Sequence, residues 1–369
     1  MRVCIGWRRL LLLLPVIFLF PHIISVLQLH KDSTIEHQHQ KLTKKFDHLV
    51  FGPAAGEGLH DRLQCQGTKA LNKTHFPSSP RNSNYGDGIS FVTVFTTYNS
   101  TADSFIKSRS SEQVSVGKMS YNKVERSMAV LNVFVNFLER NRVTLYPIKG
   151  EYSRDKLMLQ RIRSYIVFLE QKLEEQSQLQ GRISHYIFTD SDVAVVDDLG
   201  QIFKDYPLFD LALTFRNNKE QPLNSGFIAV RGSRSGIQRA KVFLQEVLEV
   251  YSSKYMKASR MLGDQLALAW VVKSHPSFNT KRFTRQQPFE EKIGGASVLF
   301  LPCATYNWTP PEGAGQFHGM PLDVKVVHFK GSRKRLMLES WNFLNSSPSP
   351  HISDMLCLIL SSGRTKYDF

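Results

Sequence analysis

Residues 185–192 read His-Tyr-Ile-Phe-Thr-Asp-Ser-Asp, a mostly apolar run that ends in two carboxylates. The short apolar segment 186–188 has the length and composition of a buried strand. Polar residues directly after such a strand are typical of ligand sites in α/β proteins, because ligands bind beyond the carboxyl ends of the strands. The stretch therefore predicts both a sheet and a site at the edge of that sheet.

Strands and helices alternate on both sides of this stretch. Apolar or β-rich runs predict strands, and apolar residues at three- and four-residue spacing predict helices. The alternation predicts an α/β fold with a mostly parallel central sheet flanked by helices. The predicted strands are 89–97, 143–148, 186–188, 211–215, 226–230, 298–301 and 324–329, and the predicted helices are 124–140, 155–175, 237–255 and 264–272.

Four groups of polar residues are interpreted as following apolar strands, where a ligand would be expected. Each group offers oxygen, nitrogen or backbone N–H groups that could contact a charged or hydroxylated molecule. The groups are Thr96-Thr97, Asp190-Ser191-Asp192, Asn224-Ser225-Gly226 and His328-Phe329-Lys330-Gly331.

Asp190 and Asp192 form the only Asp-x-Asp pair that directly follows a predicted strand. In extended backbone, residues i and i+2 face the same side, so both carboxylates could reach one cation. Mn²⁺ and Mg²⁺ prefer oxygen ligands and also bind phosphate oxygens. The alternative is a solvated loop with a capping aspartate, which is how Asp197 and Asp198 are interpreted.

His328 lies in the last predicted strand, and Lys330 and Gly331 follow it. An imidazole at this place could complete a metal shell, while Lys330 and the backbone of Gly331 meet a diphosphate. A structural histidine is the alternative.

Asp264 and Gln265 open a predicted helix, where an aspartate commonly caps the first turn. The functional interpretation places Asp264 near a sugar. Asn224 similarly allows two interpretations, a turn before a strand or hydrogen bonds to sugar hydroxyls.

The chain carries 47 Lys and Arg against 32 Asp and Glu, a formal net charge of +15. This excess favours anionic partners such as phosphates or acidic glycans. The basic residues are scattered rather than gathered in a run, so nucleic acid is not expected as a partner. The cysteines Cys4, Cys65, Cys303 and Cys357 have no C-x-x-C spacing, which argues against zinc and leaves one disulfide among the last three open.

The N-terminus is predicted to be an uncleaved membrane anchor. Arg2, Arg8 and Arg9 precede an apolar run over 10–29, roughly long enough to span a bilayer. Positive charge before the span predicts a cytosolic N-terminus and a lumenal remainder, a type II orientation. The alternative is a cleaved signal peptide, although residues 25–27 make a poor cleavage site.

Residues 30–87 contain polar and Gly/Pro/Ser-rich stretches and are expected to form a flexible stem. N-glycosylation sequons, which are compatible with a lumenal location, begin at Asn72, Asn99, Asn307 and Asn345.

Taken together, the segments resemble the plant nucleotide-diphospho-sugar transferase domain proteins, which have a GT-A fold. The resemblance spans about 91–343, and the family's Asp-x-Asp motif matches Asp190-Ser191-Asp192. Together with the anchor and the stem, it divides the chain into four regions: 1–29 as cytosolic tail and signal-anchor, 30–87 as stem, 88–345 as the GT-A domain and 346–369 as C-terminal tail. The segments that carry it are 91–99, 152–165, 185–192, 222–227, 261–267 and 326–331.

The resemblance implies a glycosyltransferase, either hexosyl- or pentosyltransferase, that moves a sugar from a nucleotide-sugar donor, most simply UDP-linked, to a glycan or glycoprotein in the Golgi or the endoplasmic reticulum. The order of the motifs is similar to that of retaining enzymes of the glycogenin type. The implied metal ligands, for Mn²⁺ or Mg²⁺, are Asp190, Asp192 and His328. The implied donor contacts are Thr96, Thr97, Lys156, Ser191, Lys330 and Gly331, and the residues around the transferred sugar are Asn224, Asp264 and Gln265.

The chain departs from the family's pattern near residue 140. There the predicted helix 124–140 runs directly into 141–143, where the family has a further strand that ends in Thr-Asp-Pro. A missing strand in this half of the fold predicts a second possibility, a catalytically impaired protein that still binds nucleotide or glycan. A metal-dependent phosphohydrolase is a third, but two-metal sites use more clustered His and Asp ligands than the sequence offers.

Overall fold

The structure is a computed structural model. It describes residues 61–66, 69–72, 88–96, 114–116, 119–121, 130, 134–135, 144–150, 157–178, 184–258, 262–310, 320–334, 337–338, 353–354 and 356–357. The predicted anchor over 1–29, most of the predicted stem, and the candidate residues Thr97 and Lys156 lie outside these ranges. So do most of the predicted helix 124–140 and the region of the missing strand.

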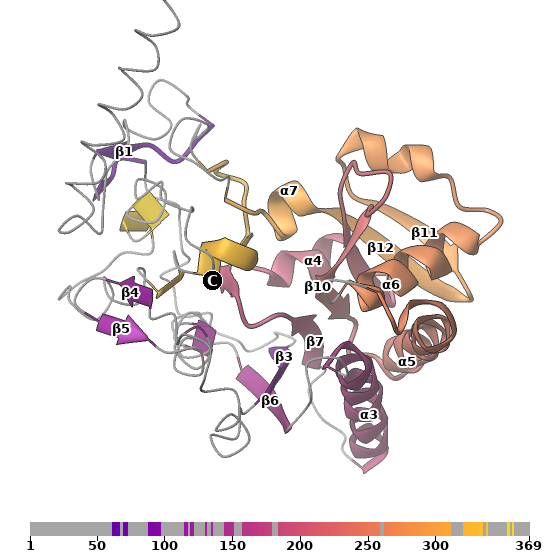
Figure 1. The fold of residues 1–369 in the computed structure, drawn as a ribbon. Coiled ribbons are helices and arrows are strands. Elements are labelled where there is room, and N and C mark those ends of the chain that lie inside the picture. The colour runs from indigo at the N-terminus through magenta and orange to yellow at the C-terminus, as the bar shows by residue number, and fades with distance from the viewer. Residues whose placement is uncertain are drawn as a thin grey trace, which may run out of the picture. The chain divides into compact units, whose positions relative to one another are not determined.

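A seven-stranded sheet forms the centre of the described fold, in the order β11-β12-β9-β10-β7-β3-β6 (Figure 1). Strands β6, β3, β7, β9 and β12 run in one direction, and β10 and β11 run in the other. The predicted α/β class with a mostly parallel sheet is therefore confirmed. The bounds are β3 Gly88–Thr96, β6 Thr144–Gly150, β7 Ser184–Thr189, β9 Leu211–Phe215, β10 Leu223–Val230, β11 Phe289–Ile293 and β12 Ala296–Pro302.

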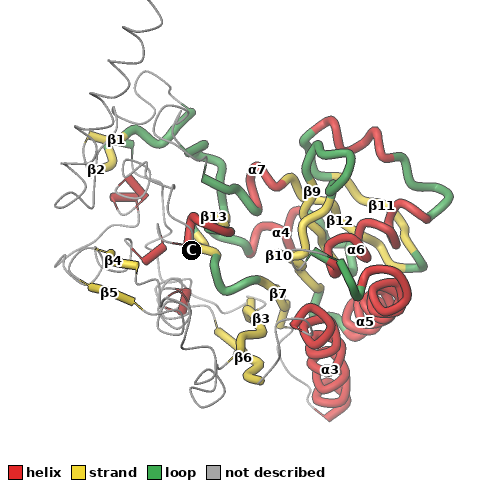
Figure 2. Tube along the Cα trace, in the orientation of Figure 1, coloured by secondary structure: helices red, strands yellow, loops and turns green. Residues whose placement is uncertain are grey.

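Three helices cover one face of this sheet: α3 (Leu157–Gln178), α5 (Arg234–Val250) and α6 (Gly263–Ser274) (Figure 2). In α3 the residues Ile162, Tyr165 and Leu169 are buried, at the spacing expected for one helix face. Helix α5 begins at Arg234, where the side chain of Ser233 accepts a hydrogen bond from the backbone N–H of Gly236. A π-helical turn, Tyr251–Tyr255, extends α5 to the end of the predicted helix 237–255.

The opposite face of the sheet packs against a second cluster of buried residues. Strand residues Phe91, Ile187 and Ala212 lie in this cluster, whereas their neighbours Val92, Phe188 and Leu213 lie in the cluster beneath the helices. This alternation is the period of two that a strand imposes on its side chains. The short helix α4 (Gly200–Asp205) contributes Ile202 and Phe203 to the second cluster.

A small two-stranded sheet, β8 (Val193–Val195) with β13 (Val326–His328), lies outside the central sheet. The two strands are antiparallel, with His328 opposite Val193, and the backbone N–H of Phe329 donates to the carbonyl of Asp192 at 2.7 Å. The strand predicted over 324–329 is shorter in the structure, where β13 pairs only with the three-residue β8, a strand that was not predicted. This pairing brings residue 328 beside residues 190–192.

The hairpin β11–β12 contains a strand that was not predicted. Gly294 and Gly295 connect the two strands, and both have positive φ, 55° and 83°. A Gly-Gly pair between two strand-like runs is a recognised signal for this turn, since glycine adopts positive φ without strain. Strand β11 has the sequence Phe-Glu-Glu-Lys-Ile, and its three charged residues are not typical of a strand. The Gly-Gly signal could have predicted this edge strand.

A disulfide joins Cys65 to Cys357 across 292 positions of the sequence. Around it, the backbone N–H of Leu63 donates to the carbonyl of Met320, and that of Ala70 donates to the carboxylate of Asp354. Residues that precede the central sheet in the sequence and residues that follow it therefore pack together in the second cluster. Among the described cysteines, Cys303 has no disulfide, and burial raises the pKa of its thiol to about 11, so it is a poor nucleophile at neutral pH.

Among the helices of the described part of the chain, none combines the length and apolar character that a membrane span requires.

Candidate metal centre

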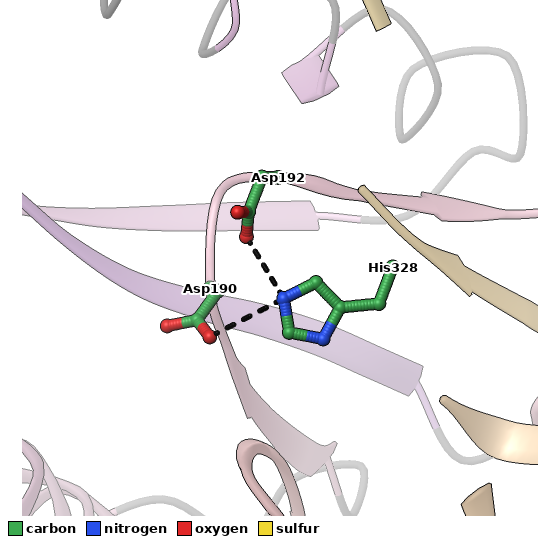
Figure 3. A group of neighbouring side chains, drawn as sticks. All are labelled: Asp190, Asp192 and His328. Carbon is green, nitrogen blue, oxygen red and sulfur yellow. Dashed lines mark ion pairs between the residues drawn. The ribbon is translucent and has the colours of Figure 1, made fainter. Parts of the chain in front are cut away.

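Asp190, Asp192 and His328 converge just beyond the end of β7 (Figure 3). One ligand atom from each lies within 4.8 Å of the others. His328 Nε2 is 3.2 Å from Asp192 Oδ1 and 3.7 Å from Asp190 Oδ2. We refer to these three residues as the Asp-Asp-His group. Two carboxylates and an imidazole are ligands that suit Mn²⁺, which accepts oxygen and nitrogen donors.

Two strand pairings position the group. The chain leaves β7 at Thr189, whose hydroxyl donates to the carbonyl of Gly226 at 3.0 Å in the neighbouring β10. It then bends through residues 191–192 into β8, which pairs with β13 and so with His328. The carboxylates thus meet through a bend, and the extended backbone assumed from the sequence was wrong for this step.

Gly226 leaves the space that the group needs. A Cβ at this position would lie 2.6 Å from Asp190 Oδ2, 2.8 Å from His328 Cε1 and 2.9 Å from Asn224 Oδ1. A side chain of any size would therefore displace at least one of the two ligands. The glycine forms one wall of a cradle in which the donor atoms of the group face one another, as a bound cation requires.

Arg161 of α3 balances the negative charge on one side of the group. Its guanidinium lies 2.9 Å from Asp190 Oδ1 and 3.3 Å from Asp264 Oδ2, and it donates to the carbonyl of Ser225 at 2.6 Å. Burial alone would lower the pKa of Arg161, but Asp190, Tyr165 and Asp264 outweigh it and raise that pKa. The arginine is therefore a permanent buried cation beside the group.

Asp192 is held on the other side by Lys334, whose Nζ lies 2.8 Å from Asp192 Oδ2. Burial opposes ionisation of this carboxyl, but Lys334 and His328 outweigh burial and hold its pKa well below the usual range. Asp192 is only 5% exposed. It is therefore an ionised carboxylate in the interior, and ionised carboxylates are what a hard divalent cation binds.

Asp264 lies in the first turn of α6, but its carboxylate faces Arg161 as well as the backbone N–H of Gln265, to which Oδ1 is bonded at 2.8 Å. Burial and the nearby Asp190 raise its pKa, and Arg161 offsets part of this effect. Gln265 is buried and its amide donates to Gln221 at 3.2 Å. The structure therefore brings Asp264 to the Asp-Asp-His group through Arg161.

Asn224 lies at the start of β10, although the sequence suggested a position after a strand. Because β10 runs antiparallel to β7 and β9, its beginning lies at the same edge of the sheet as their ends. The side chain of Asn224 accepts a hydrogen bond from the backbone N–H of Gly226 at 2.8 Å. Asn224 is therefore next to the group, for a different topological reason from the one expected.

The other predicted site residues are placed less closely. Ser191 lies in the bend between the two aspartates and is partly exposed. Thr96 ends β3, and only its backbone is described. Gly331 has a φ of +65° and follows Lys330, where the chain turns away from β13.

Lys330 shares its surroundings with two arginines. Burial, Arg216 and Arg333 all lower its pKa, whereas Cys303 and Asp192 act in the opposite direction. The arginines are partly held by backbone carbonyls, Arg216 by that of Gln221 and Arg333 by that of Pro310. Three cations gathered at one place are repulsive, so an anionic ligand there would relieve the repulsion.

Three residues of this centre were not predicted from the sequence: Arg161, Lys334 and Asn307, whose Oδ1 lies 2.7 Å from His328 Nδ1. Arg161 carried a signal, because it precedes Tyr165 and Leu169 by steps of four on a predicted buried helix face. Asn307 was interpreted only as part of a sequon. Lys334 lies beyond the last predicted strand and gave no signal.

No protein-family model matches the chain, and no curated protein matches its sequence. Among solved structures, it is similar to a glycosyltransferase involved in the glycosylation of the major capsid of PBCV-1, with 12% identity and a TM-score of 0.39 over 68% of this chain and 99% of that one. It is also similar to an active-site mutant of LgtC, with 11% identity and a TM-score of 0.33 over 66% and 87% of the two chains. For the glycosyltransferase GlyE of Streptococcus pneumoniae TIGR4, the identity is 13% and the TM-score 0.29, over 55% of this chain and 47% of that one. These levels of identity and overlap assign no function to the chain.

Proposed function

We propose that this chain is a metal-dependent glycosyltransferase that moves a sugar from a nucleotide-sugar donor to a glycan or glycoprotein acceptor. The observation that carries the proposal is the convergence of Asp190, Asp192 and His328 at the edge of an α/β sheet. The order of motifs seen in the sequence supports transfer with retention at the anomeric carbon.

The residues present fit a divalent cation. Asp190, Asp192 and His328 would hold it, and the cradle at Gly226 leaves room for their donor atoms. When bound, such a cation, Mn²⁺ or Mg²⁺, supplies Lewis-acid stabilisation of a diphosphate leaving group. Arg161 keeps Asp190 oriented from the far side, so this carboxylate is positioned before any ligand arrives.

A sugar would be contacted by polar groups next to the metal ligands. Asp264 is oriented by Arg161, and Asn224 and Gln265 lie close by in β10 and α6. Carboxylate and amide groups of this kind bind sugar hydroxyls and fix the orientation of the ring. Thr96, Thr97 and Lys156 belong to the proposal as nucleotide contacts on the resemblance alone.

The direct test is a panel of UDP- and GDP-sugars, scored for release of the nucleotide in the presence of Mn²⁺ and candidate acceptors. We expect acceptor-dependent release from one donor, and chelation of the metal should abolish it. Tight binding of UDP with Mn²⁺ but no release from any donor would favour the impaired, binding-only protein that the departure near residue 140 suggests. Release of UMP or GMP together with a sugar phosphate, in place of UDP or GDP, would indicate a phosphohydrolase.

We expect Lys330→Ala to weaken the binding of UDP with Mn²⁺ by about 1.5–3 kcal/mol, the contribution of one charge-assisted phosphate contact. The reason is the gathering of Lys330, Arg216 and Arg333, which favours an anion. Isothermal titration measures the change. Lys273→Ala is the control, since this lysine lies in the last turn of α6 and bonds only the carbonyl of Lys219 among the described contacts. Equal affinities for the two variants would assign Lys330 a surface role.

We further propose a type II membrane protein whose folded part faces the lumen of the Golgi or the endoplasmic reticulum. The charges at Arg2, Arg8 and Arg9 support this orientation, and the disulfide Cys65–Cys357 supports an oxidising compartment. Protease added to sealed microsomes should leave the C-terminal part intact until detergent is added. Complete digestion without detergent would overturn the orientation.

A further inference from the structure

The sequon Asn307-Trp308-Thr309 lies inside the candidate metal centre. Asn307 follows helix α7 (Cys303–Tyr306) and is only 4% exposed. Its neighbour Trp308 is bonded to β13 in both directions, since its N–H donates to the carbonyl of Val326 and its carbonyl accepts from the N–H of His328. These two backbone bonds hold the side chain of Asn307 beside the imidazole of His328.

The hydrogen bonds around Asn307 can be oriented without ambiguity, starting from a backbone amide. The N–H of Gly226 can only donate, so the side-chain atom of Asn224 that it meets at 2.8 Å is the oxygen. That same oxygen is 2.9 Å from the amide of Asn307, which must therefore present its NH₂ group there. The NH₂ group also donates to the hydroxyl of Thr214 at 3.2 Å.

The remaining polar atom of Asn307 is its oxygen, which lies 2.7 Å from His328 Nδ1. An oxygen can only accept, so His328 Nδ1 carries the proton. In a ring that binds a metal, the other nitrogen, Nε2, carries no proton, and Nε2 is the atom that faces Asp190 and Asp192. The tautomer of the candidate ligand thus follows from a chain of three amides that begins at Gly226.

We propose that Asn307 is a positioning residue that holds His328 in the Nδ1-protonated tautomer with Nε2 directed at the metal, and that it is not a glycan acceptor. The first part rests on the proposed metal site. Both hydrogens of the Asn307 amide are already donated within the fold, and the residue is only 4% exposed, so a glycan on this nitrogen would break both hydrogen bonds. Groups that bond the far nitrogen of a histidine ligand typically change metal affinity about 10–100-fold when removed.

The test uses the full-length protein, Mn²⁺ alone, and three variants. Asn307→Leu has a similar volume and removes the hydrogen bonds. Asn307→Asp keeps an acceptor for His328 Nδ1 but removes the sequon, and Thr309→Ala removes the sequon but keeps Asn307. Isothermal titration measures Mn²⁺ affinity, pulsed electron paramagnetic resonance detects the ¹⁴N coupling of an imidazole bound to Mn²⁺, and glycosidase digestion followed by mass measurement counts glycans.

We expect Asn307→Leu to bind Mn²⁺ about 10–100-fold more weakly and to lose the ¹⁴N coupling. Asn307→Asp should keep the coupling, and Thr309→Ala should match the wild type in affinity, coupling and glycan count. If Asn307→Leu does not fold, Asn307→Asp decides, and loss of the coupling there overturns the role in orientation.

Three further results would overturn the inference. A lower glycan count in Thr309→Ala would show that Asn307 carries a glycan. Wild-type affinity and coupling in folded Asn307→Leu would remove its role in positioning while leaving the proposed function intact. A wild-type protein without Mn²⁺ binding would remove the metal site itself, and with it both proposals.

Discussion

Asp192→Asn is expected to lower metal-dependent transfer on the order of a thousandfold, which corresponds to about 4 kcal/mol of barrier. The carboxylate of Asp192 is buried, ionised and directed at His328 Nε2, and an amide cannot supply its charge to a divalent cation. The measurement is turnover with the donor that the panel identifies, together with the rise in melting temperature that Mn²⁺ produces.

The same substitution should also destabilise the metal-free protein by about 1–3 kcal/mol at neutral pH, because it removes the buried negative charge that pairs with Lys334 at 2.8 Å. The sequence alone suggests the reverse, since two adjacent carboxylates repel each other when no cation is near. The structure changes this expectation by placing Lys334 against Asp192 and Arg161 against Asp190.

The dependence of this stability on pH has a definite sign. The pKa of Asp192 is lowered in the folded protein from its ordinary value of 3.8, so its contribution is complete above about pH 4. It is lost as the pH falls below that value towards the folded pKa. The difference in unfolding free energy between wild type and Asp192→Asn should therefore shrink as the pH falls below 4.

Asp197→Asn is the matched control for Asp192→Asn. Asp197 also forms an ion pair with a lysine, Lys325, at 2.8 Å, but it lies outside the Asp-Asp-His group. We expect this variant to retain both turnover and stabilisation by Mn²⁺. An Asp192→Asn protein that behaves in the same way would contradict the metal-site interpretation.

Gly226→Ala is expected to weaken Mn²⁺ binding at least about 100-fold, although the sequence change is one methyl group. The added Cβ would lie 2.6 Å from Asp190 Oδ2 and 2.8 Å from His328 Cε1, so both candidate ligands would have to move. Overpacking of this kind costs about 1–3 kcal/mol of stability, which a folded domain commonly tolerates. The variant should therefore remain folded, so that its loss of metal binding can be measured on the folded protein.

Gly88→Ala provides the comparison, because Gly88 also lies in a strand of the central sheet and its added Cβ would meet only Ser184 Oγ at 3.7 Å. We expect Gly88→Ala to bind Mn²⁺ as the wild type does. Titration with Mn²⁺ and thermal melts of both variants test the difference. Equal affinity for Mn²⁺ in the two alanine variants would show that the cradle at Gly226 is not where the metal binds.

The sequence predicts the parts of this fold that have strong local patterns. The apolar run before Asp190 and the helical spacing around Tyr165 each specify their element, and both elements are observed. Pairing partners were harder, because the direction of β10 depends on contacts between residues far apart in the chain. Asn224 nevertheless lies at the same edge of the sheet as Asp190, because β10 begins where its antiparallel neighbours β7 and β9 end.

The site residues that the sequence did not predict share one physical property. Arg161 and Asn307 act through side chains that are buried by tertiary packing, and burial of a polar residue is not visible in local sequence. A charged or amide residue is expected at the surface by default. Only the fold shows that Arg161 meets Asp190 and that Asn307 meets His328.

The disulfide between Cys65 and Cys357 bears on where a secreted, recombinant fragment of this protein should begin and end. A fragment limited to residues 88–345 would lack both cysteines, together with the backbone bond from Leu63 to Met320. Met320 and Leu338 are buried in the same cluster as Leu63, so loss of residues 61–66 would expose apolar surface there and favour aggregation. A fragment that begins before residue 61 and ends after residue 357 keeps the disulfide. We expect it to aggregate less than the fragment 88–345.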